Sequence, residues 1–313
     1  MADPNGHSLV GYNDNTILAQ LYRLFSGLYE EFMEILYSFL TKKGRLERAL
    51  ETKSISHAAY MRILEKALGD RRSGYTRISE GMGDETEVDT VLREEKIQAQ
   101  GKRRDDMKAT LEIALKRISA IDELAQKVES LRMQSFDSSN PSHVQLLTRL
   151  WTLLRPNEEL EGLISKQWRD IGFQGNNPST DFRGMGILSL HQLVFFAENE
   201  PELVDNIMSL CNHPAIGFPF AVAGITFTSL TRALLQADLL NSHFYNTRSE
   251  SVTIDDFHYA YVRIFALFSD YFKRSNPPSV MHFNVVRTQF ELSLSSILQR
   301  EDADLHAITI DHL

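Results

Sequence analysis

Residues 168–193 read WRDIGFQGNNPSTDFRGMGILSLHQL, and this stretch decides how the rest of the chain is interpreted. A run of turn formers precedes one arginine, Arg183, which lies between Asp181-Phe182 and two close glycines, Gly184 and Gly186. Apolar residues spaced by three and four follow the glycines and predict an amphipathic helix. The stretch therefore predicts a single arginine presented on a loop just before a helix.

The residue types leave more than one role for Arg183. An arginine beside an aspartate is usually half of a structural ion pair or a loop anchor. It can also serve as a point charge for an anion, including a phosphoryl group in the active site of a partner. The segment Gly184-Met185-Gly186 before a helix could in addition form an anion-binding nest, although short glycine pairs are a weak signal alone.

Composition narrows the class of protein. The chain has 313 residues, of which 42% are apolar, and this suits a soluble globular protein of one large or two moderate domains. The formal net charge of −9 argues against nucleic-acid binding, which needs a basic face. A single cysteine, Cys211, excludes an internal disulfide and fits a reducing compartment. The first ten residues carry no basic segment or apolar run, so we expect no secretory signal and a cytoplasmic protein.

Apolar residues recur with helical spacing through most of the chain and predict an all-α fold without strands or repeats. The helix at 105–133 is expected to be a core element rather than half of a coiled coil. Thr253 and Asp256 are expected to form a capping box. Glycines among charges predict a mobile loop at 70–85. The predicted helices are 17–40, 54–69, 105–133, 144–154, 158–170, 187–197, 203–210, 220–240, 253–273 and 277–300.

Turn formers at 138–141 predict a domain boundary. We expect an amino-terminal helical region at 1–137, a second helical domain at 138–302 and a frayed tail at 303–313.

The amphipathic helix at 16–40 has two interpretations. Thr16 is a fair N-cap, and the apolar stripe is followed at once by Lys42, Lys43, Arg45 and Arg48. A stripe beside a basic cluster could place 16–48 in peripheral contact with a membrane. The alternative is a helix packed on the protein. Acidic residues on the polar face, such as Glu34, would oppose anionic lipid and favour the packed helix.

The opening stretch resembles the signature of ELMO-domain proteins, W-x3-G-F-Q-x3-P-x-T-D-F-R-G-x-G-x3-L-x2-L. The pattern is met without a gap by Trp168, Gly172, Phe173, Gln174, Pro178, Thr180, Asp181, Phe182, Arg183, Gly184, Gly186, Leu190 and Leu193. Within that family the likeness is greatest to the short ELMOD group and covers most of the chain, including LWTLLRPNEELEGLISKQW before the signature and HPAIGFPFAVAGITFT after it.

This resemblance implies an all-α multi-helix ELMO domain that activates GTP hydrolysis by an Arf-family GTPase in its GTP-bound form. The chain would then regulate an enzyme rather than turn over a substrate, and no metal or cofactor is implied. Arg183 would be the catalytic finger, because a guanidinium supplied from outside neutralises charge on the transferring phosphoryl group and accelerates hydrolysis by about 10³ to 10⁵. The alternative is a non-catalytic ELMO-domain scaffold that docks a GTPase or an exchange-factor complex.

The other signature residues would support the finger or contact the partner. Trp168, Phe173 and Phe182 are expected to pack the base of the loop. Asp181 and Thr180 could cap the next helix or orient Arg183. Gly184 and Gly186 would let the backbone approach a partner closely. Gln174 could orient a water, or bond to loop backbone. Gly172 and Pro178 complete this supporting set.

Overall fold

The computed structural model describes residues 29, 32–52, 56–69, 87–246 and 251–313. These residues form helices and no strand, as the periodicity predicts. The longer helices are α2 (Arg45–Glu51), α3 (His57–Leu68), α5 (Glu87–Glu94), α6 (Lys102–Met133), α7 (Pro141–Leu154), α8 (Gly186–Asn199), α9 (Pro201–Cys211), α10 (Phe220–Gln236), α11 (Asn241–Asn246), α12 (Ile254–Ser275) and α13 (Phe283–Leu298). Short 3₁₀ segments are η2 (Lys166–Ile171), η3 (Pro178–Arg183), η4 (Val280–His282) and η5 (Ile310–His312).

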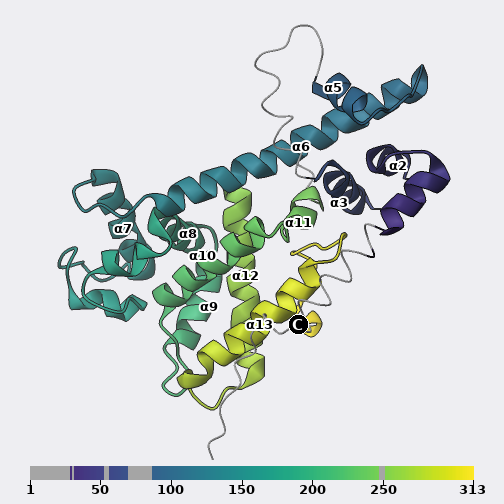
Figure 1. Ribbon diagram of the computed structural model, residues 1–313. Coiled ribbons are helices and arrows are strands. Elements are labelled where there is room, and N and C mark those ends of the chain that lie inside the picture. Colours follow the sequence, from purple (N-terminus) through teal and green to yellow (C-terminus); the bar gives the residue numbers. More distant parts are fainter. Residues whose placement is uncertain (1–28, 30–31, 53–55, 70–86, 247–250) are drawn as a thin grey trace, which may run out of the picture.

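Helix α6 runs along one edge of the molecule, and the bundle of α8, α10, α12 and α13 packs beneath it (Figure 1). Helices α8 and α12 are buried on several sides, because apolar residues occupy most of their surface. Phe265 of α12 lies 4.8 Å from Phe227 of α10 and 5.7 Å from Phe196 of α8, measured between ring centroids. These aromatic contacts hold the centre of the bundle together.

The predicted role of α6 as a core element is confirmed. Its residues Met107, Leu111, Leu115, Ile118, Ile121, Leu124 and Val128 are buried. The amino-terminal helices α2, α3 and α5 pack near one end of α6, and α3 also lies against α11, whereas α7 and α8 pack near the other end. The chain does turn at 138–140, between α6 and α7. A division into domains at that turn stays a prediction.

Two predicted helices differ clearly from the observed ones, and the short helices α2, α5 and α11 are not among the predicted ones. The helix expected at 158–170 is reduced to η2, because the side chain of Gln167 donates to the Glu159 carbonyl at 2.9 Å and accepts the Glu161 N–H at 2.8 Å. These bonds take the place of helical backbone bonds. The last long helix begins at Phe283, after η4, rather than at the prolines 277–278. The capping box of Thr253 and Asp256 is confirmed at the start of α12.

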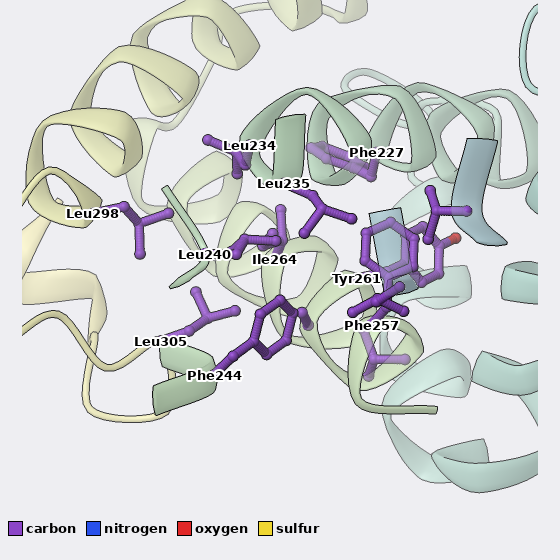
Figure 2. Close-up of a cluster of buried hydrophobic side chains, with 14 of the residues drawn as sticks. Phe227, Leu234, Leu235, Leu240, Phe244, Phe257, Tyr261, Ile264, Leu298 and Leu305 are labelled. Carbon is purple, nitrogen blue, oxygen red and sulfur yellow. The ribbon is translucent and has the colours of Figure 1, made fainter. Parts of the chain in front are cut away.

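The prediction of a frayed tail at 303–313 is wrong. Leu305 is completely buried and Ile308 nearly so. Figure 2 shows Leu305 pointing into the same apolar cluster as Phe244 of α11 and Leu298 of α13. Arg263 of α12 donates hydrogen bonds to the backbone carbonyl of Ile308, at 2.5 Å, and to that of Leu305. The carboxyl end is therefore part of the core.

The preferred interpretation of the amino-terminal amphipathic helix is wrong for the part that the structure describes. Residues 32–41 are helical, but their apolar side chains face solvent instead of packing on the protein. Residues 16–28 and 30–31 of the predicted helix, and the loop predicted at 70–85, lie outside the described residues. No helix in the described part of the chain is long and apolar enough to cross a bilayer.

Candidate functional site

The signature loop is built from η2 and η3, which follow one another between α7 and α8. Asn177 caps η3, because its side-chain oxygen accepts the Ser179 N–H at 3.1 Å and the Ser179 hydroxyl at 2.7 Å. Pro178 occupies the first turn of η3, where its missing N–H costs no hydrogen bond. The predicted turn formers therefore position the segment that carries Arg183.

A row of contacting aromatic rings forms the buried base of the loop. Trp168 lies edge-on to Trp151 of α7 at 5.6 Å between centroids, and edge-on to Phe173 at 5.7 Å. Phe173 in turn lies edge-on to Phe182 at 5.5 Å. Trp168, Phe173 and Phe182 are all buried, as the sequence predicts for the base of the loop. The indole N–H of Trp168 also donates to the Leu163 carbonyl at 3.2 Å.

Two signature glycines allow close approach of backbone within the chain itself. Gly172 has φ +89°, and a Cβ there would overlap the backbone of Pro219 and Phe220 at the start of α10. Gly186 has φ +55°, and a Cβ there would overlap the carbonyls of Arg132 and Gln134 at the end of α6.

The expectation that Gly186 serves close approach of a partner is therefore wrong, because it is buried against α6. Gly184 is different. Its φ of −80° suits any residue, it is exposed, and nothing lies within 4 Å of an added Cβ. Gly184 remains on the surface beside Arg183.

The structural ion pair between Arg183 and Asp181 is absent. Asp181 accepts the Gln174 backbone N–H through Oδ2 at 2.8 Å and the Thr180 hydroxyl through Oδ1 at 3.4 Å. Arg183 is exposed and makes no ion pair or side-chain hydrogen bond with any residue that the structure describes. Its guanidinium is thus free to meet a group from outside the chain.

The roles expected of Thr180, Gln174 and the glycine nest change accordingly. Thr180 donates to the Asn177 carbonyl at 2.9 Å, so it braces η3 rather than α8 or Arg183. Gln174 contributes its backbone N–H, and its side chain is exposed. The nest is largely occupied, because the Met185 N–H donates to the Phe182 carbonyl at 3.2 Å and the Ile187 N–H to the Gln134 carbonyl at 2.8 Å.

A groove of about 410 Å³ opens beside Arg183. One wall is formed by signature residues and the other by α10. Its lining residues are Gln174, Thr180, Asp181, Gly184, Met185, Val222, Ile225, Thr226 and Ser229. We call this the α10 groove. The α10 residues were not among the predicted site residues, because they lie about thirty residues beyond the end of the signature. Their position follows from the Val222 N–H, which donates to the Gly172 carbonyl at 3.2 Å.

A second cavity, of about 600 Å³, lies between α6, α7, α8 and α12 and contains His191 and His258. Burial, with the positive charges of His191 and Lys127, lowers the pKa of His258 to about 3. Burial also lowers the pKa of His191. In the part of the chain that the structure describes, no three His, Cys, Asp or Glu residues are grouped so as to hold a metal ion.

The amino-acid sequence is similar to those of a known protein family. The model of the ELMO/CED-12 family matches residues 126–287. The "ELMO domain-containing protein 2" of Homo sapiens is 33% identical over 281 residues, which cover 89% of this chain and 95% of that protein. The protein of the same name from Bos taurus is 38% identical over 211 residues, or 67% of this chain and 71% of that protein. The "ELMO domain-containing protein 1" of Bos taurus is 33% identical over 286 residues, or 85% of this chain and 87% of that protein. No solved structure matches the chain significantly.

Proposed function

Because this chain belongs to the ELMO/CED-12 family, with relatives in the ELMOD group, we propose that it is a GTPase-activating protein for a small GTPase of the Arf family, acting in the cytoplasm. Arg183 would enter the nucleotide site of the GTP-bound partner. There its guanidinium would neutralise charge that develops on the γ-phosphoryl group during hydrolysis.

The exposure of Arg183 carries the proposal. An arginine that acts in a partner's active site must extend beyond the surface of its own protein, and its charge must not already be neutralised by a neighbouring carboxylate. Arg183 meets both conditions among the described residues, whereas neighbouring Asp181 is engaged with Gln174. The position of a catalytic arginine must also be fixed, since a misplaced catalytic group lowers the rate of the reaction. The buried aromatic chain and the Asn177 cap fix the loop that carries it.

The α10 groove supplies a surface for the same partner. If Arg183 enters the nucleotide site, the groove next to it must face the partner segments that border that site. Half-buried Val222 and Ile225 offer an apolar wall, and Gln174, Thr180 and Ser229 offer polar groups. A surface with an apolar centre and polar edges is typical of transient protein interfaces.

Single-turnover hydrolysis tests the proposal. A panel of GTP-loaded small GTPases, including Arf-family members and others as controls, is mixed with the purified protein, and phosphate release is followed. We expect acceleration for at least one Arf-family member and tighter binding when a transition-state mimic fills the γ-phosphate site. Binding without acceleration, with equal affinity for the GDP, GTP and transition-state forms, would instead support a non-catalytic scaffold.

A further inference from the structure

The helix at 32–41 presents an unpaired apolar face to solvent. Most of its exposed apolar residues recur at intervals of three and four, which places them on one side of the helix, whereas Tyr37, 49% exposed, lies off that side. Phe39 is 79% exposed and Phe32 61%. The whole face consists of Tyr29, Phe32, Ile35, Leu36, Phe39 and Leu40, and we call it the amino-terminal apolar face. A cluster of large apolar side chains is costly to leave in water and marks an interaction site.

The acidic side chain of this helix points the other way. Glu34 forms an ion pair with Arg48 of α2 and lies 3.9 Å from Arg45. Glu34 and its neighbour Met33 are partly buried, whereas the apolar face is exposed. The carboxylate of Glu34 is therefore neutralised, and it is turned toward the body of the protein.

Basic side chains follow the apolar face at its carboxyl end. Lys42 is exposed, and its ammonium group has no partner among the described residues. Arg45 keeps 52% of its side chain exposed, and its contact with Glu34 is long. Aromatic and aliphatic residues on one face, with the unpaired Lys42 and the half-exposed Arg45 beside them, form the pattern of a helix that lies in a membrane interface.

We propose that the amino-terminal apolar face docks the protein on an anionic lipid surface. Lipid fits better than a second copy of the chain, because two copies meeting through this face would bring their basic ends near one another or leave them unneutralised. Anionic headgroups neutralise those cations. The proposal stands independently of the GTPase activity.

Vesicle sedimentation with the full chain tests this proposal. Vesicles of phosphatidylcholine alone are compared with vesicles that also contain phosphatidylserine. We expect the wild-type protein to bind the anionic vesicles, and higher salt to weaken binding. The double variant Phe32→Ser/Phe39→Ser should lower the apparent affinity at least ~10-fold, because it removes two aromatic side chains that would be buried in the interface. Lys42→Glu should lower it by less.

Met281→Ser is the matched control, because Met281 is 84% exposed and lies elsewhere, in η4. It should leave binding unchanged. All three variants should keep the wild-type melting temperature, since each altered side chain is exposed. No binding of the wild-type protein to anionic vesicles would overturn the proposal. So would a large fall in melting temperature for the double variant, which would mean that the face packs on the chain. Self-association abolished by the double variant, without lipid binding, would assign the face to a second copy.

Discussion

The carboxylate of Asp181 accepts the backbone N–H of Gln174 at 2.8 Å and leaves Arg183 unpaired among the residues that the structure describes. The acidic residue next to the arginine thus fastens the two halves of the signature loop together. One residue keeps the loop in shape while the other remains available to a partner. This division of roles predicts different consequences for changes at the two positions.

Replacing Asp181 should act mainly through the loop. Asp181→Ala leaves the Gln174 N–H without its acceptor, so we expect a loss of about 1–2 kcal/mol of stability, seen as a lower melting temperature. Stimulated hydrolysis should fall less than ~10-fold, because the Asn177 cap and the aromatic base remain. Asp181→Asn keeps a side-chain oxygen and should recover part of the stability. A fall in rate as large as that of an Arg183 variant, at an unchanged melting temperature, would contradict this role.

Gly186 and Gly184 form a matched pair for a second test. Gly186→Ala places a Cβ against the carbonyls of Arg132 and Gln134 at positive φ, so we expect a loss of about 2–4 kcal/mol. Gly184→Ala adds a methyl group in open space at a compatible φ, and should change stability by less than about 1 kcal/mol. Thermal unfolding of both variants tests this expected difference in stability. Equal melting temperatures would mean that α8 does not begin against the end of α6.

His258 predicts a pH dependence of stability. Its pKa is lowered to about 3 in the folded protein, while the unfolded side chain titrates near its ordinary value of 6.5. Between about pH 3 and pH 6.5 the imidazole is therefore protonated in the unfolded chain and neutral in the folded chain. Stability therefore falls as the pH drops below about 6.5, by about 1–2 kcal/mol between pH 7 and pH 5 from this residue.

Replacing the imidazole tests this attribution. His258→Phe keeps an aromatic ring against Phe195, whose centroid lies 5.0 Å away, and should make chemical unfolding less sensitive to pH over this window. His282→Gln is the control, because His282 is exposed and should leave the pH dependence as it is. An unchanged pH profile in His258→Phe would assign the acid sensitivity to other groups, such as His243, whose pKa burial also lowers.

Several features of the fold and site could be predicted from the sequence because they depend on neighbours in the chain. The capping box of Thr253 and Asp256 spans one helical turn. The aromatic base of the loop involves residues within the signature, from Trp168 to Phe182. The spacing brings the two residues of the capping box together, and the aromatic rings belong to one short loop whose apolar residues need burial.

Other features depend on contacts between distant segments, and local patterns could not predict them. The ordered tail needs Arg263, which reaches the carbonyl of Ile308 from α12. The position of Gly186 against Arg132 needs the end of α6. Periodicity identified the apolar face of the amino-terminal helix, but it could not tell whether protein covers that face.

The α10 groove predicts a separation between binding and catalysis. Ile225→Asp places a charge on the apolar wall next to Arg183, so it should raise the concentration of the protein needed for half-maximal stimulation ~10-fold or more. The rate at saturation should change little. Leu292→Asp, on the exposed face of α13, is the control and should match the wild type. An unaffected Ile225→Asp protein would remove the groove from the interface.

The most direct test of the central claim is the single-turnover rate of GTP hydrolysis stimulated by Arg183→Lys and Arg183→Ala, measured beside their melting temperatures. Lysine keeps the charge but loses the planar fork that reaches two phosphoryl oxygens, so both variants should lose at least ~100-fold of the stimulation. Their melting temperatures should match the wild type, because Arg183 is exposed and unpaired among the described residues. A stable Arg183→Ala protein that stimulates hydrolysis as well as the wild type would contradict the account.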